Sequence, residues 1–320
     1  MNRTTYIIFV LALMLGSCRF ASEKAAEEGR SLYVIHAGSL TQPVQDMARA
    51  FEQEHPGIGI LTEAWGSKAG ARRVIEFETP ADVFLSADYM VIENMLIPEH
   101  ASWYLPFATN EMAIVYTSDS RYSDRIHTGN WPDILLRDDI GYARSNPDHD
   151  PCGVRSVFTI QLAEKKYGLS GFSDRLLSKD VHNIRPKETD LIALLEVGQV
   201  DYIFLYRSVA MQHGLKYLRL PDSLSLGNPA LNNWYRLASL ETLGARPGET
   251  ITEYGEAMVY GLTIPHRTRN SQLAEKFAAF VMDPDRGGRI MQQAGQGRVR
   301  DFDNPYAAGV PESLRKYPER

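Results

Sequence analysis

The chain has no run rich in lysine or arginine, which a nucleic-acid-binding surface would require. Its formal net charge is −6 at pH 7, and acidic and basic residues are interspersed along its 320 residues. With 44% hydrophobic and 23% charged residues, the composition is that of a globular protein and does not favour disorder. The length predicts two domains, or one domain in two lobes, and we expect no nucleic-acid partner.

Long hydrophobic segments are also missing. An apolar run, Tyr6–Leu15, has about half the length of a membrane-spanning helix but fits the core of a signal peptide. Small residues and then Cys18 follow directly, which is typical of the bacterial lipoprotein cleavage signal. We therefore expect a lipoprotein signal peptide over residues 1–17, a lipid on Cys18 and a polar tether over residues 18–30. The alternative is an ordinary signal peptide with an incidental cysteine.

Cysteine is scarce, with two in the whole chain. If Cys18 carries a lipid, no intramolecular disulfide is available, and Cys152 is either a small buried residue or a reactive thiol. Cys152 lies in a dense loop, Asn146–Gly153, with the sequence NPDHDPCG. That loop raises the possibility of a metal site or a catalytic nucleophile. However, the chain has no second histidine cluster with metal-ligand spacing, no G-x-S-x-G elbow and no phosphate-binding loop of the G-x-x-x-x-G-K type.

The first third of the mature chain alternates between strands and helices. Strands are expected over residues 31–37, 58–64 and 81–88, and helices over residues 41–55 and after Ser67. This β-α-β-α-β order predicts a parallel sheet covered by helices. Two strand-to-helix turns carry the pairs Gly38-Ser39 and Gly66-Ser67, at the sheet edge where ligands bind in such folds. Helix N-termini there suit an anion, although each serine is also compatible with a simple N-cap.

A second α/β unit follows, and the chain crosses between the two units twice. The crossings are expected in two extended segments, Glu111–Thr117 and Glu256–Pro265. We expect one lobe to comprise residues 31–112 plus 263–320 and the other to comprise residues 113–262. A two-lobed protein with a hinge places its ligand in the cleft between the lobes.

Several motifs, taken together and in order, make residues 31–290 similar to the archaeal-type tungstate/molybdate-binding proteins of ABC transporters. The motifs are HAGSL, GSKAGARRVIEF, ADVFLSAD, ARSNPDHDPCGVRS, RPKETDLIALLE, VDYIFLYRSVAMQHGLKYLRLP and VYGLTIP. The resemblance implies the α/β type II periplasmic-binding-protein fold, with two lobes joined by two hinge strands. It also implies binding of a tetrahedral oxyanion through residues matched to Gly38, Ser39, Ser67, Pro151, Cys152 and Tyr206. Two carboxylates, Asp150 and Glu188, are implied as ligands of the metal atom in that oxyanion.

Two carboxylates beside a dianion are unfavourable unless they bond to it, because like charges at close range cost several kcal/mol at an effective protein dielectric. Tungsten(VI) and molybdenum(VI) are large enough to accept further oxygen ligands, whereas sulfur in sulfate is not. The acids would therefore accept tungstate or molybdate and repel other oxyanions. By spacing alone, Glu188 is equally compatible with the first turn of a helix and Tyr206 with a core position.

We therefore expect a monomeric, lipid-anchored substrate-binding protein of an ABC importer in the cell envelope, facing the periplasm or the exterior. It would deliver tungstate or molybdate to a permease, without a cofactor and without catalysis. Three alternatives remain open. They are a binder of sulfate, thiosulfate or phosphate, a ferric-ion binder, and a metal-dependent enzyme using Asp148, His149, Asp150 and Cys152.

Overall fold

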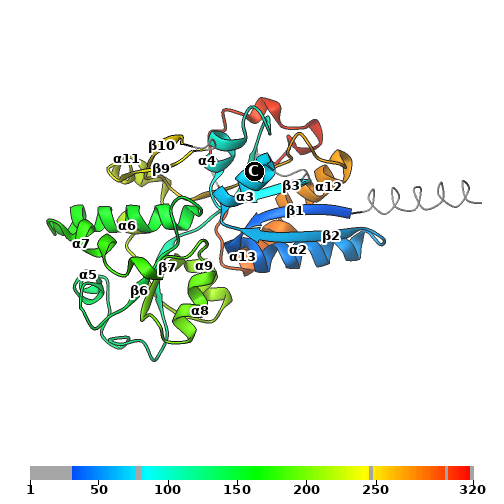
Figure 1. Cartoon of the computed structure of the whole chain (residues 1–320). Helices are drawn as coiled ribbons and strands as arrows, with labels where there is room; N and C mark the ends of the chain where they lie inside the picture. The colour runs from blue at the N-terminus through cyan, green and yellow to red at the C-terminus, as the bar shows by residue number, and fades with distance from the viewer. Residues whose placement is uncertain (1–30, 77–80, 245–247, 300–301, 318–320) are drawn as a thin grey trace, which may run out of the picture.

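The computed structural model describes residues 31–76, 81–244, 248–299 and 302–317, and within them the chain forms two α/β lobes (Figure 1). The expected signal peptide, Cys18 and the tether lie outside the described residues. Among the residues that are described, no helix is both long and apolar enough to cross a membrane.

The first lobe is built on a five-stranded sheet with the order β2-β1-β3-β11-β4. The first three of these strands are parallel, and β11 is antiparallel to both of its neighbours. The strand bounds are β1 Ser31–Ala37, β2 Gly59–Trp65, β3 Val83–Ser86, β4 Leu105–Thr109 and β11 Val259–Thr263. The helices of this lobe are α2 Thr41–Glu54, α3 Ser67–Glu76, α4 Tyr89–Val91, α12 Ser271–Met282 and α13 Gly287–Gln293.

Helices cover both faces of this sheet because its central strands are apolar on both sides. In β1, Val34 packs in the large hydrophobic cluster and its neighbour Ile35 packs in a second cluster. The apolar face of α2 lies in the large cluster, where Phe51 makes edge contacts with Phe277 and Phe280 of α12. The expected β-α-β-α-β order of this lobe is therefore what the structure contains.

The second lobe contains a four-stranded sheet with the order β6-β7-β5-β8 and a separate hairpin of β9 and β10. The strand bounds are β5 Met112–Tyr116, β6 Tyr142–Ala143, β7 Tyr202–Tyr206, β8 Lys216–Arg219, β9 Ser239–Leu243 and β10 Thr250–Tyr254. The helices are α5 Trp131–Leu135, α6 Pro151–Tyr167, α7 Phe172–Ser178, α8 Asp190–Glu196, α9 Arg207–Gln212, α10 Asp222–Ser225 and α11 Asn232–Tyr235.

The two crossings lie slightly earlier in the chain than we expected. The first is at Asn110 and Glu111, between β4 and β5, so Met112 begins a strand of the second lobe. The second precedes Val259, because all of β11 pairs with β3 and β4 in the sheet of the first lobe. The expected boundary between residues 262 and 263 therefore falls inside a strand of the first lobe.

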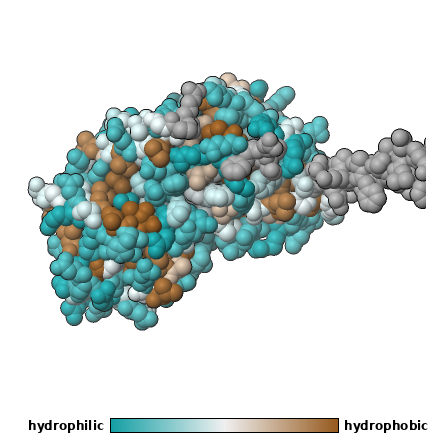
Figure 2. All heavy atoms as spheres, viewed as in Figure 1, coloured by the Kyte–Doolittle hydropathy of each residue, from teal (hydrophilic) through white to brown (hydrophobic). Residues whose placement is uncertain are grey.

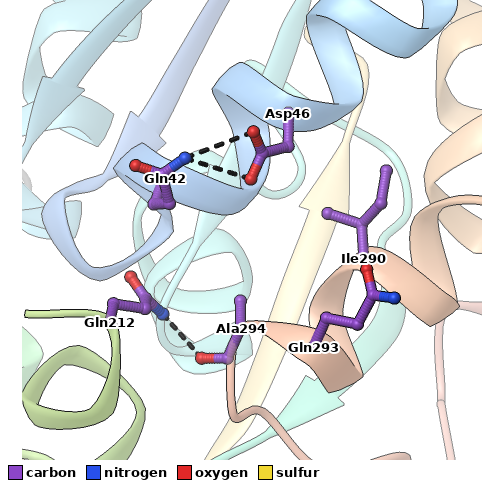
Figure 3. A pocket seen from close by; sticks show the side chains of 6 residues that line it. All are labelled: Gln42, Asp46, Gln212, Ile290, Gln293 and Ala294. Atoms are coloured by element: carbon purple, nitrogen blue, oxygen red, sulfur yellow. Dashed lines mark hydrogen bonds between the residues drawn. The ribbon is translucent and has the colours of Figure 1, made fainter. Parts of the chain in front are cut away.

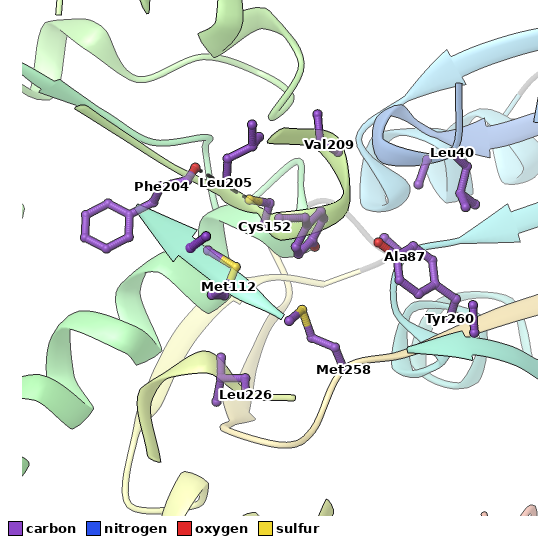
Figure 4. Packing of buried hydrophobic residues seen from close by; sticks show 14 of the residues in the cluster. Leu40, Ala87, Met112, Cys152, Phe204, Leu205, Val209, Leu226, Met258 and Tyr260 are labelled. Carbon is purple, nitrogen blue, oxygen red and sulfur yellow. Dashed lines mark hydrogen bonds between the residues drawn. The ribbon is translucent and has the colours of Figure 1, made fainter. Parts of the chain in front are cut away.

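The lobes are packed against each other through apolar residues as well as polar ones. One hydrophobic cluster contains residues of both lobes, including Leu40 and Tyr260 from the first and Met112 and Cys152 from the second (Figure 4). On the face shown in Figure 2, hydrophilic residues cover most of the surface, with a hydrophobic patch on the second lobe. The two lobes are therefore in direct contact along the boundary between them.

Candidate functional site

Asp150 and the start of α6 form the centre of the candidate site in the second lobe. Asp150 is the N-cap of α6, where its extended backbone lets one carboxylate oxygen accept from the Cys152 N–H at 3.1 Å. The other oxygen accepts from the Glu188 N–H at 2.8 Å. These two hydrogen bonds bring together two carboxylates that are 38 residues apart in the sequence. Burial raises the pKa of Asp150, and the hydrogen bonds oppose that rise.

Glu188 carries the most unusual carboxylate among the described residues. Its side chain is 1% exposed, and among the described residues neither carboxylate oxygen makes a hydrogen bond of the usual geometry, although the Asp150 carboxyl and the Ser39 N–H both face it. Burial, followed by the charge of Asp150, raises the pKa of Glu188 well above its usual value. A buried polar group without a partner is rare in folded proteins and calls for an explanation. The explanation we develop below is that this carboxylate is a ligand for the bound solute.

The first lobe approaches Glu188 through the turn that follows β1. A Cβ atom at Gly38 would lie 3.1 and 3.2 Å from the two Glu188 carboxylate oxygens. The backbone N–H of Ser39, at the start of the next helical turn, lowers the pKa of Glu188 and so favours its charged form. Gly38 and Ser39 therefore face Glu188 across the boundary between the lobes, and Gly38 has no room for a side chain there.

The three hydroxyls that the resemblance assigns to the oxyanion are all buried. Ser67 begins α3, and its Oγ accepts from the Ala87 N–H at 2.9 Å. Ser39 Oγ accepts from the Tyr260 hydroxyl at 3.3 Å. Tyr206 lies at the end of β7, and its hydroxyl accepts from Arg155 Nη1 at 3.0 Å.

Arg155 places a buried positive charge against the Tyr206 hydroxyl. It comes from α6 in the second lobe, is 5% exposed, and forms an ion pair at 2.8 Å with Asp88 of the first lobe. It also donates to the Ala87 carbonyl at 3.2 Å. Burial opposes the charge on Arg155, but Asp88 and Tyr206 together hold its pKa above the usual value. Arg155 is therefore a buried, salt-bridged residue that joins the two lobes beside Tyr206.

A second buried cation joins the lobes at the hairpin. Lys68, next to Ser67 on α3, is 2% exposed and donates to the Pro147 carbonyl at 3.0 Å and to Thr242 at 2.9 Å. It also forms an ion pair with Glu253 of β10. All of these acceptors belong to the second lobe, so Lys68 fastens the N-terminus of α3 to the hairpin.

The loop Asn146–Gly153 does not gather its polar side chains into a cation site. Among the described residues, no group of three or more His, Cys, Asp and Glu side chains is placed to hold a metal ion. Asp148 and His149 are both half-buried. An Asp148 carboxylate oxygen accepts from the Leu243 N–H at 2.9 Å, and the His149 carbonyl accepts from the Ala69 N–H at 3.2 Å. Through the His149 carbonyl the loop contacts the first lobe, whereas the bond between Asp148 and Leu243 stays within the second lobe.

Pro151 and Cys152 begin α6 directly after Asp150. The Cys152 N–H donates to the Asp150 carboxylate and proline has no N–H, and the contacts that the resemblance implies at these two positions stay an expectation. The Cys152 side chain is buried beside Phe204 and Leu205, and its Sγ lies 3.8 Å from the Phe204 carbonyl oxygen (Figure 4). Burial raises the pKa of this thiol well above its usual value. It is therefore a small packed residue and not a reactive thiol.

A pocket of about 290 Å³ also lies on the seam between the lobes, away from these residues (Figure 3). Its lining comes from α2 and the region of α13 in the first lobe and from α9 in the second. Within it, Gln212 donates to the Ala294 carbonyl at 2.7 Å and Gln42 donates to Asp46. None of the residues expected to bind a solute lines this pocket.

Comparison with known proteins identifies the family. A family model described as bacterial extracellular solute-binding protein matches residues 32–295. This chain belongs to that family. The family consists of solute-binding transport proteins, and its extracellular character places the chain in the periplasm or at the exterior.

Two curated relatives and one solved structure agree with this assignment. The chain is 43% identical over 314 residues to a solute-binding protein of Petrotoga mobilis, covering 98% of this chain and 96% of the relative. It is 35% identical over 341 residues to the molybdate/tungstate-binding protein WtpA of Thermococcus kodakarensis, covering 96% and 94% respectively. The resemblance to the archaeal-type proteins is therefore confirmed.

The solved structure is the periplasmic molybdate-binding protein of Azotobacter vinelandii. It has a TM-score of 0.61 at 17% identity and covers 84% of this chain and 100% of its own. That likeness concerns the fold, and it confirms the expected type II arrangement of two α/β lobes.

Several residues of the site were not found by sequence reasoning. Lys68 and Tyr260 lie within two of the motifs that carry the resemblance, GSKAG and VYGLTIP, but neither residue was predicted to belong to the site. Ser145, two residues after β6, is fully buried and its hydroxyl has no hydrogen-bond partner that meets the usual geometry among the described residues. Its hydroxyl faces Asp150 and opposes the rise in the pKa of that carboxyl. The one available signal was its position five residues before Asp150, in the same motif.

Proposed function

We propose that this protein captures tungstate or molybdate between its lobes and delivers the anion to the permease of an ABC importer. The observation that carries the proposal is the Glu188 carboxylate, which is buried beside the Asp150 carboxyl and makes no hydrogen bond of the usual geometry among the described residues. A carboxylate in that position is costly unless a ligand engages it. A high-valent metal that accepts extra oxygen ligands would do so.

The remaining groups fit the four oxygens of such an anion. Ser39, Ser67 and Tyr206 each accept one hydrogen bond from the protein and keep a hydroxyl hydrogen that they can donate. A tetrahedral oxyanion without protons offers only acceptors, so three such donors match it. The identity of 35% with the Thermococcus protein, whose name states molybdate and tungstate as its ligands, supports the same assignment.

Binding of the anion between the lobes accounts for the packing between them. Asp150, Glu188 and Tyr206 come from the second lobe, whereas Ser39 and Ser67 come from the first. A ligand that touches both sets favours the closed arrangement over the open one. In the cell envelope, a lipid on Cys18 would keep the protein at the membrane near its permease. Replacing Cys18 with serine should release the protein from the membrane fraction.

The proposal is tested by titrating the purified protein with tungstate, molybdate, sulfate, phosphate and zinc while following its melting temperature. A ligand at 1,000 times its dissociation constant stabilises the folded state by about 4 kcal/mol, which is several degrees for a protein of this size. We expect large shifts with tungstate and molybdate and little shift with sulfate. A shift with zinc alone would contradict the proposal and favour a cation site.

The role of the carboxylates is tested by the double variant Asp150→Asn with Glu188→Gln. It keeps the shape of both side chains and makes both poorer ligands for a metal, but the amide at position 150 also sets its NH₂ group against one of the two backbone N–H donors. We expect it to fold with a lower melting temperature and to lose far more affinity for tungstate than for sulfate. Unchanged tungstate affinity would show that the carboxylates do not ligate the metal.

A further inference from the structure

The three hydroxyls of the site share one feature beyond their burial. Each makes one hydrogen bond with the protein, and the direction of that bond decides whether the hydroxyl's own hydrogen is free for a ligand. For Ser67 the donor is the Ala87 N–H, and for Tyr206 it is the guanidinium of Arg155. Neither of these donors can act as an acceptor, so the direction of both hydrogen bonds is fixed.

Ser39 is different because its partner is another hydroxyl. The oxygens of Tyr260 and Ser39 are 3.3 Å apart, and either group has a hydrogen to give. If Tyr260 donates, the Ser39 hydrogen is free for an anion. If Ser39 donates, a lone pair of Ser39 faces the anion and repels it. The affinity therefore depends on what decides between the two directions.

The Asn110 side chain determines which of the two hydroxyls, Tyr260 or Ser39, donates to the other. Its carbonyl oxygen accepts from the backbone N–H groups of Glu111 at 2.9 Å and Ser208 at 3.4 Å. Those two contacts exclude the flipped amide, which would set its NH₂ group against two further donors. The Asn110 NH₂ group must therefore donate, and it does so to Tyr260 and to Ser208 Oγ, both at 2.7 Å.

The hydrogen bond from Asn110 to Tyr260 in turn fixes the direction of the hydrogen bond between Tyr260 and Ser39. Tyr260 accepts from Asn110, and burial raises the pKa of Tyr260, so its hydroxyl keeps its one hydrogen. That hydrogen goes to Ser39 Oγ, and the Ser39 hydrogen is left to point away from Tyr260. We propose that Asn110 is a positioning residue that sets Ser39 as a hydrogen-bond donor to the bound oxyanion, acting through the Tyr260 hydroxyl. This inference rests on the proposed function, because it assigns Ser39 to an anion.

The place of Asn110 in the fold adds to this role. It is 3% exposed in the first crossing between the lobes, and Tyr260 is in β11 just after the second crossing. Ser208, the other acceptor of Asn110, lies in the first turn of α9 in the second lobe. Figure 4 shows Tyr260 on the first-lobe side of the contact between the lobes. The Asn110 side chain thus links the first crossing to Tyr260, which follows the second crossing, and through Tyr260 to Ser39.

The test uses three variants and one comparison between them. Asn110→Asp has the same shape but presents an acceptor to Tyr260, which then donates to residue 110 and accepts from Ser39. We expect tungstate affinity to fall at least about tenfold, since a hydrogen bond to a charged group is replaced by repulsion. Tyr260→Phe removes the hydroxyl and keeps the ring contacts with Phe107 and Tyr206. It should cost only a few-fold, because Ser39 keeps its own hydrogen.

The decisive variant combines Asn110→Asp with Tyr260→Phe. If the effect of Asn110→Asp passes through the Tyr260 hydroxyl, removing that hydroxyl should restore affinity to the level of Tyr260→Phe alone. If the double variant binds no better than Asn110→Asp, then the loss comes from the added charge or from structural damage, and the inference is wrong. Wild-type affinity for Asn110→Asp would also overturn it. Melting temperatures of all variants separate a loss of fold from a loss of binding.

Two further outcomes keep this inference separate from the proposed function. If the wild type binds sulfate and not tungstate, metal ligation fails, but the same three variants still test the direction of the Ser39 hydrogen bond. If the Asn110→Asp protein does not fold, neutron diffraction from deuterated wild-type crystals reads the direction without a substitution. If the deuterium that lies between the Tyr260 and Ser39 oxygens is bonded to the Ser39 oxygen, the inference is wrong.

Discussion

Replacement of Gly66 by alanine should weaken anion binding without weakening the fold. A Cβ atom at Gly66 would lie 2.5 Å from the His149 carbonyl oxygen and 3.1 Å from the Asp150 Cβ, both in the other lobe. Gly66 is not among the residues with positive φ, so its own backbone tolerates alanine. The clash exists only while the lobes are together, and opening the cleft relieves it.

The magnitude follows from the depth of that overlap. Overpacking of this kind costs about 1–3 kcal/mol when neighbouring backbone has to move. Because an anion bound by both lobes requires closure, the whole cost is subtracted from the binding free energy. We therefore expect the affinity for tungstate to fall by about 5- to 150-fold. Calorimetric titration measures this fall, and small-angle X-ray scattering should show a more open protein.

Gly153→Ala is the matched control. Its Cβ atom would lie 2.5 Å from the Ser145 carbonyl oxygen, within the same lobe, so no opening of the cleft relieves the clash. We expect this variant to lower the melting temperature of the ligand-free protein, whereas Gly66→Ala should leave it nearly unchanged. Wild-type affinity for Gly66→Ala, or a melting temperature as low as that of Gly153→Ala, would refute the reasoning.

Three further predictions concern charge and burial. Because the pKa of Glu188 is raised on folding, the stability it contributes is full below its usual pKa of 4.5 and is lost as pH rises through the raised value. The melting temperature of the ligand-free protein should therefore fall from pH 5 to pH 8, and less steeply in Glu188→Gln; equal slopes would contradict this. Lys68→Met leaves Glu253 without its ion-pair partner and should raise the rate of tungstate dissociation at least about tenfold, as measured by stopped flow. The double variant Lys68→Met/Glu253→Gln removes the unpaired charge and should bring the dissociation rate part of the way back to the wild-type value. The Cys152 thiol, buried and with a raised pKa, should react with a disulfide reagent at pH 8 only after denaturation, and rapid reaction of the native protein would show otherwise.

The fold was largely predictable from sequence because its signals are local. Apolar spacing in α2 and the Gly-Ser turns after β1 and β2 place helix N-termini at one edge of a parallel sheet. The positions of Asp150 and Glu188 came from the resemblance, and the structure adds the hydrogen bond that joins them. The boundary error in β11 has a physical reason. An extended apolar segment looks the same whether it crosses between lobes or pairs within a sheet.

What the sequence did not reveal depends on contacts between distant residues. Asn110 alone is typical of a turn, and Tyr260 alone is typical of a buried strand. Their roles arise only when Tyr260 meets Ser39, 221 residues away, and Asn110, 150 residues away. Lys68 and Glu253 are 185 residues apart, and no local pattern links the first turn of a helix with a hairpin that sequence reasoning did not predict. Such pairings arise from tertiary packing, and no short stretch of the sequence indicates which distant residue a given side chain will contact.

The central claim is that Asp150 and Glu188 bond to the metal of the captured anion. X-ray absorption at the tungsten edge, recorded on the protein with bound tungstate, tests it most directly because it counts the oxygen neighbours of the metal. We predict four short tungsten–oxygen distances and two additional oxygen neighbours, the latter lost in the Asp150→Asn/Glu188→Gln variant. A spectrum with four equivalent oxygens in the wild type, identical to that of free tungstate, would contradict the account.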